Sequence, residues 1–272
     1  VSMGIEYFTS PIDIDADGRV DFGVARYDGF ESYVSVLRSV AGGFALGASA
    51  PLSGRAQWIV SGDFDGDGTP DLAVHYFGIP DSGGPGAWRV GLYKWSSAGE
   101  LVRFGEHEVG SSLFDSPSIV DFNGDNASDI IFSSDGIARV LISDSAGGFT
   151  VGDETPIYRG GLHVADLNVD GRLDLVGWSG SQRRFEVLLG REAGGFESLG
   201  ITPIVATNGL IVDVETRDID ADGRVDLLFG SRLDGHIKAY TIERWGFEDG
   251  TFGYRDEQWS LRRAAVNGVS PG

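Results

Sequence analysis

The sequence predicts an all-β protein built from five similar units, and two observations support that prediction. The chain is rich in glycine and aromatic residues, with 42 Gly, 16 Phe, 8 Tyr and 6 Trp, which suits short strands joined by tight turns. An acidic nine-residue pattern, D-x-[DN]-x-D-[GN]-x-x-D, also occurs five times, with starts 50, 58, 45 and 52 residues apart. We therefore expect one structural unit for each acidic segment.

The acidic segments occupy residues 13–21 (loop 1), 63–71 (loop 2), 121–129 (loop 3), 166–174 (loop 4) and 218–226 (loop 5). Loop 2 shows the chemistry most fully, because its carboxylates stand at positions 1, 3, 5 and 9 and Gly68 stands at position 6. Hard divalent cations take six to eight oxygen ligands, and the glycine allows the sharp bend that a short loop needs. The backbone carbonyl of Thr69, at position 7, is a natural further ligand. These features predict a calcium loop.

Loops 3 and 4 depart from this pattern. Asn123 and Asn168 replace the aspartate at position 3, so each of these loops carries one charge fewer and we expect weaker sites there. Asn126 replaces the glycine in loop 3, and asparagine tolerates a left-handed backbone better than most residues. Position 2 is apolar in every loop, which predicts a side chain packed beneath it. The position 2 residues are Ile14, Phe64, Phe122, Leu167 and Ile219.

A second signature, a small residue and glycine before a large apolar residue, follows each loop start by about 30 residues. It predicts a hairpin turn that leads into a strand. Two strand-like runs lie between loop and turn, and a third precedes the loop. Four-stranded units of about 50 residues predict a β-propeller of five four-stranded blades, one calcium loop per blade. We expect a single domain over 1–272, with blades at 5–52, 53–109, 110–157, 158–205 and 206–261 and a tail at 262–272.

The net charge of −20 has a local origin. The five loops hold 18 of the 41 acidic residues, and the other 23 nearly balance the 21 Lys and Arg. The acidity therefore reflects metal ligands, and it argues against nucleic-acid binding.

The chain has no apolar run long enough for a membrane span and no cysteine for a disulfide scaffold. Because such loops fill reliably where free calcium is millimolar, we expect an extracellular location, secreted or on the cell surface.

The loops and turns together resemble the FG-GAP or VCBS-type repeats of integrin-like propellers, over nearly the whole chain. An EF-hand is rejected, because position 12 is Val24, Val74, Phe132, Gly177 or Phe229 where an EF-hand needs glutamate. The resemblance implies about five Ca²⁺ ions, held by the side chains at positions 1, 3, 5 and 9 and by the carbonyl at position 7. It also departs from the family, whose members commonly have seven blades. The implied ligands are Asp13, Asp15, Asp17, Arg19, Asp21, Asp63, Asp65, Asp67, Thr69, Asp71, Asp121, Asn123, Asp125, Ala127, Asp129, Asp166, Asn168, Asp170, Arg172, Asp174, Asp218, Asp220, Asp222, Arg224 and Asp226.

The sequence offers no clear catalytic constellation. The four histidines share no spacing, and no nucleophile motif or phosphate loop is present. We therefore expect a binding protein without a catalytic or cofactor-binding site. Aromatic residues favour recognition of a glycan or an extracellular protein on the rim away from the calcium loops; they are Trp95, Trp245 and the residues Tyr76, Phe77 and Trp88 beside the long 77–87 loop. The alternatives are a subunit of an oligomer or larger extracellular assembly and, third, a calcium-dependent polysaccharide lyase or a hydrolase.

Overall fold

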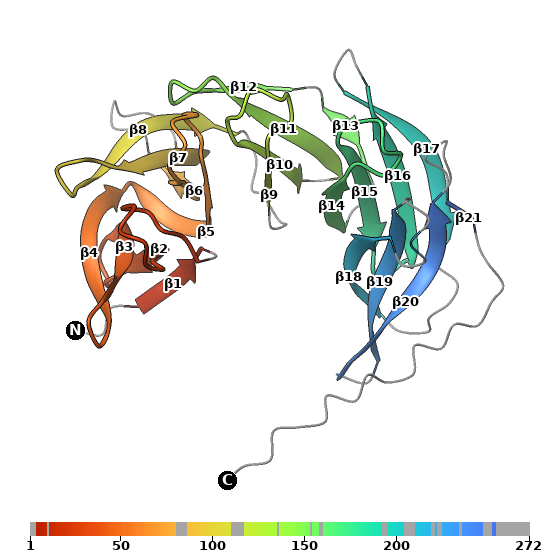
Figure 1. The fold of residues 1–272 in the computed structure, drawn as a ribbon, viewed down its shortest axis with the longest axis horizontal. Helices are drawn as coiled ribbons and strands as arrows, with labels where there is room; N and C mark the ends of the chain where they lie inside the picture. The colour runs from red at the N-terminus through yellow and green to blue at the C-terminus, as the bar shows by residue number, and fades with distance from the viewer. Residues whose placement is uncertain are drawn as a thin grey trace, which may run out of the picture. The chain divides into compact units, whose positions relative to one another are not determined.

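The structure of this chain is a computed structural model that describes residues 4–9, 11–79, 86–109, 117–134, 136–152, 154–157, 160–191, 195–203, 210–218, 221, 225–233, 236–246 and 252–253. These residues form strands β1 to β21 in five antiparallel sheets and contain no helix (Figure 1). The predicted all-β class is therefore confirmed. None of the described segments is a helix that could cross a membrane. Contacts divide the chain into two units, 1–159 and 160–272, and each unit is described by itself.

The first unit holds three sheets, and in each of them strands that are adjacent in the sequence pair with one another. The first sheet contains β1 (Gly4–Phe8), β2 (Phe22–Tyr27), β3 (Ser32–Val40) and β4 (Gly43–Leu52). The second contains β5 (Gly54–Gly62), β6 (Asp71–Gly78), β7 (Ala87–Trp95) and β8 (Leu101–Glu108). The third contains β9 (Ser118–Val120), β10 (Asp129–Ser134), β11 (Ile137–Ser143), β12 (Phe149–Val151) and β13 (Thr155–Pro156).

The second unit holds two sheets with the same strand order. One contains β14 (Gly161–Ala165), β15 (Asp174–Ser179), β16 (Arg184–Gly190) and β17 (Phe196–Pro203). The other contains β18 (Leu210–Arg217), β19 (Asp226–Leu233), β20 (His236–Gly246) and β21 (Phe252–Gly253). Every acidic loop thus joins the first and second strands of a sheet, as the repeat predicts. The expected tail at 262–272 lies outside the described residues.

The third sheet departs from four simple strands. Its outer strand is broken into β12 and β13, and both pieces pair with β11. Directly after β12, the Gly152 amide donates to the carbonyl of Val140 at 2.8 Å, so this residue also lies against β11. The extra strand is therefore a continuation of the predicted fourth strand and not a new element.

The second strand of each sheet explains how the sheets pack. Along β6, Leu72, Val74 and Tyr76 join a core with the first sheet, whereas Ala73 joins a core with the third. Because side chains alternate across a strand, β6 is buried on both faces and its sequence is almost continuously apolar. A separate core in the second unit joins its two sheets.

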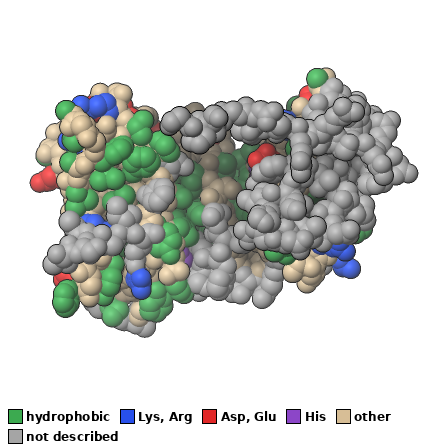
Figure 2. Space-filling model, turned by 90° about the horizontal axis from the view of Figure 1, so that it is seen from below, with side chains coloured by type: hydrophobic (Ala, Val, Ile, Leu, Met, Phe, Trp, Pro, Cys, Tyr) green, Lys and Arg blue, Asp and Glu red, His purple; other side chains and the backbone are tan. Residues whose placement is uncertain are grey.

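Among the described residues, the outer strands are more exposed to solvent than the second strands. Most of β4 and β8 is exposed or half-buried, and β4 carries the exposed side chains of Phe44 and Leu46. Figure 2 shows hydrophobic side chains interspersed with polar and charged ones on one face of the molecule. The sheet cores thus stabilise the units, while the loops between first and second strands are left at the sheet ends.

Candidate metal centres

The first aspartate of each described loop organises the loop backbone. In loop 2, Asp63 Oδ1 accepts the amide of position 5 at 3.1 Å, and Oδ2 accepts the amide of position 6 at 2.8 Å. Loops 1, 3 and 4 repeat both bonds at 2.9 to 3.1 Å through Asp13, Asp121 and Asp166. A carboxylate at position 1 therefore closes the turn itself, whether or not a metal is present.

Two positions of the loops, 4 and 6, adopt a left-handed backbone wherever they are described. Position 6 does so in the four loops where it is described, with φ of 80° at Gly18, 83° at Gly68, 69° at Asn126 and 84° at Gly171. This confirms the predicted bend, including the asparagine substitution in loop 3. Position 4 does so as well, which the sequence analysis missed although two loops carry glycine there. The position 4 values are 56° at Ala16, 72° at Gly66, 77° at Gly124, 59° at Val169 and 60° at Ala221.

The residues at positions 2 and 9 fix each loop to its sheet. Ile14, Phe64 and Leu167 are buried, as predicted for position 2, whereas Phe122 is half-buried. The position 9 aspartates are almost wholly buried and directly precede or begin the second strand; they are Asp21, Asp71, Asp129, Asp174 and Asp226. A buried carboxylate requires compensating partners. The partners differ between loops.

In loops 3 and 4, backbone amides satisfy both oxygens at position 9. Asp129 Oδ2 accepts the amide of Phe122 and Oδ1 that of Ser143, each at 2.8 Å. Asp174 does the same with Leu167 at 2.8 Å and Gly190 at 2.7 Å. These two aspartates therefore act as hydrogen-bonded anchors between the loop and the third strand.

In loops 1 and 2, one oxygen at position 9 lacks such a partner. Asp21 Oδ1 accepts the amide of Ser39 at 2.8 Å, but Oδ2 is buried without a hydrogen-bond partner among the described residues. Asp71 Oδ2 accepts the amide of Phe64 at 3.0 Å, and here the other oxygen, Oδ1, is the buried atom without a partner. A buried anionic oxygen left in this state points to an ion or a water molecule.

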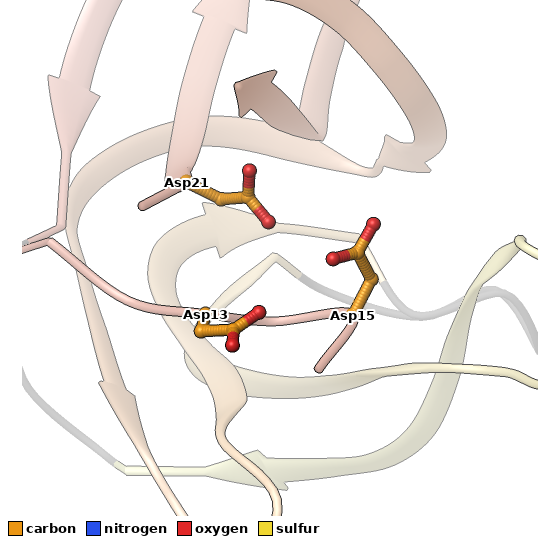
Figure 3. A group of neighbouring side chains, drawn as sticks. All are labelled: Asp13, Asp15 and Asp21. Carbon is orange, nitrogen blue, oxygen red and sulfur yellow. The ribbon is translucent and has the colours of Figure 1, made fainter. Parts of the chain in front are cut away.

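The same two loops bring three carboxylates together. Oxygens of Asp13, Asp15 and Asp21 lie within 4.8 Å of one another, and so do oxygens of Asp63, Asp65 and Asp71. Figure 3 shows the first group, with the side chains turned toward a common space from the loop and from the start of β2. Clustered carboxylates with an unsatisfied buried oxygen suit a hard divalent cation. Positions 1, 3 and 9 of loops 1 and 2 therefore fit a metal ion.

The carboxylate cluster changes the acidity of its buried member. Burial, together with the charges of Asp65, Asp67 and Asp63, raises the pKa of Asp71 to about 7. Burial also raises the pKa of Asp21 above its usual value. Without a cation, a proton is thus the simplest way to relieve the repulsion in loop 2.

A basic side chain reaches the position 3 aspartate in loops 1 and 2. Arg38 forms an ion pair with Asp15, and Lys94 Nζ lies 2.6 Å from Asp65 Oδ2. Arg38 and Lys94 occupy equivalent places on the third strand. The residue before each of them pairs with the residue that directly follows the nine-residue loop. In loops 3 and 4 the equivalent residues are Ile142 and Leu189. In loops 1 to 4, position 3 and this third-strand position therefore change together: an aspartate with a cation, or an asparagine with an apolar residue. Loop 5 departs from this pairing, because its position 3 is Asp220 and Trp245 follows the residue that pairs with Leu227.

The aspartates at position 5 are not members of either carboxylate group. The Asp67 carboxylate accepts hydrogen bonds from the Thr69 hydroxyl and amide, which lower the pKa of Asp67. Asp17 and Asp170 pair instead with the arginines at position 7, and the hydrogen bond from Arg19 lowers the pKa of Asp17. Their predicted role as ligands, and that of the position 7 carbonyls, remains a prediction.

The other predicted ligands are placed as follows. In loops 3 and 4, Asn123 and Asn168 donate from Nδ2 to the position 5 carboxylates of Asp125 and Asp170 at 2.9 Å. Ala127, at position 7 of loop 3, is buried, and its amide donates to Asp125 Oδ1 at 2.8 Å. In loop 5, Asp218 and Asp226 are described, whereas Asp220, Asp222 and Arg224 lie outside the described residues.

The histidines with described side chains are packed against other residues. His75 is fully buried and stacks between Trp58 and Trp88, with ring centroids 5.2 and 5.0 Å away. Tyr76 is also fully buried and donates to Glu106, so it is not one of the exposed aromatics that the sequence suggested. Phe77 is 49% exposed and Trp95 is half-buried, whereas the side chain of Trp245 lies outside the described residues.

Comparison with known proteins agrees with the repeat. The FG-GAP-like repeat model matches residues 13–74, 121–177 and 166–229. The fold is similar to a solved protein from Lactobacillus plantarum with a TM-score of 0.53 and 12% identity, over 89% of this chain and 72% of that one. No curated protein sequence matches the chain. The matched repeats span more than half of the chain and include all five acidic loops in full, so this chain belongs to the family of FG-GAP-like repeat proteins.

Proposed function

We propose that this chain is a calcium-binding recognition module, secreted or at the cell surface, whose repeats form the blades of a propeller. The observation that carries the calcium part is the convergence of three carboxylates in loop 1 and three in loop 2, each with a buried oxygen that no described residue satisfies. The metals are structural in this proposal, because they would neutralise carboxylates that otherwise repel one another. Positions 1, 3 and 9 of loops 1 and 2 would hold them.

The recognition part rests on exposed apolar side chains and on the family. Phe44 and Phe77 are about half exposed. FG-GAP-like repeats build a rigid sheet scaffold, and exposed aromatic rings on such a scaffold supply contact area for a partner at low entropic cost. The proposed partner is a glycan or an extracellular protein.

The test screens the purified chain against a glycan array and an array of extracellular proteins, each in millimolar calcium and in EDTA. We expect at least one partner to bind in calcium and binding to weaken in EDTA as the loops loosen. A chain that binds no partner in either array, at concentrations where a control lectin binds, contradicts the recognition function. Calcium itself is checked separately by titration calorimetry.

A second candidate is a subunit of an oligomer or a larger assembly. The exposed apolar side chains of Val40, Phe44 and Leu46 support it, because they lie on β3 and the outer strand β4, where a neighbouring chain could cover them. Mass measurement in solution decides: a concentration-independent monomer argues against self-association. A lyase or hydrolase activity remains the third candidate, tested by incubating the chain with polysaccharides in calcium.

A further inference from the structure

The first unit contains a groove that lies beside the loop 1 carboxylate group and shares Asp15 with it. Its volume is about 480 Å³, and it lies where loop 1 meets loop 2 and the turn after β7. The lining side chains that matter here are Asp15, Arg38, Thr69, Trp95, Ser96 and Ser97. Small-molecule sites have volumes of roughly 300–1,000 Å³ and combine apolar walls with a few polar groups. This groove has both properties.

Two polar atoms at the groove have no hydrogen-bond partner among the described residues. Asp15 Oδ1 is buried, on a side chain that is only 6% exposed, and its other oxygen pairs with Arg38. Arg38 Nε is also buried and without a partner. One atom is an acceptor and the other is a donor, and leaving both unsatisfied is costly. A hydroxyl group can donate to the first and accept from the second.

The charges at the groove favour a neutral ligand. Asp15 and Asp17 disfavour an anion, and Arg38 disfavours a cation. The hydroxyls of Thr69, Ser96 and Ser97 add further groups that can both donate and accept. A ligand that carries several hydroxyls and no charge therefore matches this lining best.

Trp95 gives the groove an apolar wall. The Arg38 guanidinium carbon lies 5.6 Å from the centre of the Trp95 ring, so the aromatic wall stands beside the polar groups. The carbon-bound hydrogens of a sugar ring suit such a wall, while its hydroxyls suit the polar side. A cyclic polyol thus satisfies both parts of the groove at once.

We propose that this groove binds a neutral saccharide, with Trp95 packing against the sugar ring and with Asp15 and Arg38 sharing one of its hydroxyls. The inference rests on the proposed recognition function and names its ligand class and its place. It locates binding on the side of the calcium loops, in contrast to the opposite rim that the sequence analysis favoured. Asp15 belongs both to the loop 1 carboxylate group and to the groove.

The test measures saccharide binding for wild type and three variants, in calcium or EDTA, whichever gives the tighter wild-type binding. Trp95→Ala removes the apolar wall, and Ser97→Trp fills the groove from an exposed position without removing core packing. Phe30→Ala is the matched control, since it removes a more exposed aromatic ring outside the groove. We expect a loss of at least tenfold in affinity for the first two and none for Phe30→Ala, with Ser97→Trp keeping the wild-type melting temperature.

Unchanged saccharide binding in Ser97→Trp overturns the groove, even if Trp95→Ala is too unstable to measure. Binding restricted to charged glycans also overturns it. A chain that binds a protein but no saccharide overturns this assignment and leaves the recognition function standing. A chain that binds neither overturns both.

Discussion

Loops 1 and 2 carry an aspartate at position 3 and a basic residue on the third strand, whereas loops 3 and 4 carry an asparagine and an apolar residue at these places. The net charge around each loop is therefore similar. In loops 1 and 2 a fourth carboxylate is offset by Arg38 or Lys94, and in loops 3 and 4 that carboxylate is absent. Loops 1 to 4 thus balance their acidic residues in two ways.

The two kinds of loop also use position 9 differently. Both carboxylate oxygens of Asp129 and of Asp174 accept hydrogen bonds from backbone amides, so these two carboxylates stabilise the fold directly. Asp21 and Asp71 each keep one buried oxygen without a partner. We infer that loops 1 and 2 depend on a cation, while loops 3 and 4 are held largely by their own hydrogen bonds. Each prediction below tests this difference.

The largest expected effect is that of removing calcium from the whole chain. A ligand at 100 times its Kd stabilises the folded state by about 2.7 kcal/mol for each site. For a chain of this size that corresponds to a fall of roughly 5–10 °C in Tm for each site lost. Thermal melts with calcium and with EDTA measure it, and magnesium serves as the ion control. Identical melting curves in calcium and EDTA contradict structural calcium.

The next effect separates the two kinds of position 9. Asp129→Asn places an amide NH₂ against a backbone N–H, so we expect a loss of about 2 kcal/mol in calcium and in EDTA alike. Asp71→Asn keeps an oxygen for the Phe64 amide and removes a poorly satisfied charge. It should therefore destabilise the protein in calcium and leave it unchanged or more stable in EDTA. Urea unfolding of both variants in both buffers measures this; the same calcium dependence in the two variants contradicts the comparison.

A smaller effect tests the basic residues of the third strand. Lys94→Leu imitates Leu189 and removes a cation that competes for Asp65, so we expect loop 2 to bind calcium several-fold more tightly. The change should be modest, because Lys94 is 41% exposed and its ion pair is screened by solvent. Calorimetric titration of calcium measures it. Asp65→Asn combined with Lys94→Leu copies loops 3 and 4 and should remove the gain; a gain that persists in this double variant argues against competition for Asp65.

The raised pKa of Asp71 predicts a pH dependence in EDTA. Its folded pKa is about 7, above the usual value of 3.8 that we assign to the unfolded chain. Between these values the folded state holds a proton that the unfolded state has lost, so stability falls as the pH rises from about 4 to about 7. Urea unfolding in EDTA at several pH values measures the slope. Asp71→Asn should flatten it; an equal slope in that variant assigns the effect to other groups.

The smallest effect concerns loop 4. Val169 has a φ of 59° at position 4, a conformation that costs a residue with a Cβ roughly 1–2 kcal/mol. Loops 2 and 3 carry glycine at this place, so Val169→Gly should stabilise the protein by up to about 1 kcal/mol after the entropy of glycine is deducted. Chemical unfolding tests it. Gly124→Val in loop 3 is the reciprocal change and should destabilise; a loss of stability in Val169→Gly shows that the valine side chain is needed.

Much of this molecule could be predicted from local patterns. The spacing of the acidic segments predicted the number of sheets, and the strand-like runs between loop and turn predicted their second and third strands. The bend at position 6 was also predictable, because glycine and asparagine favour positive φ. The bend at position 4 was harder to predict, since Ala16, Val169 and Ala221 carry no such signal. The glycines of loops 2 and 3 were the available hint.

The role of Arg38 and Lys94 could not be read from the loops themselves. Both residues lie more than twenty positions from their aspartates, and only the pairing of the second and third strands brings them back to the loop. Aligning the third strands of the repeats would have found them. The sequence singled out Trp95 but not the groove beside it, since the groove is formed by two sheets together.

The sequence by itself determined the all-β class, the repeat and the carboxylate-rich loops, because these follow from residue types at short range. The tertiary structure determined which carboxylates lie close together, which of their oxygens have hydrogen-bond partners and where the surface forms a groove. The reason is physical: hydrogen bonds and ion pairs at position 9 and position 3 depend on atoms delivered by neighbouring strands, within a few tenths of an ångström. Loops that share the same acidic pattern can therefore differ in their need for a metal.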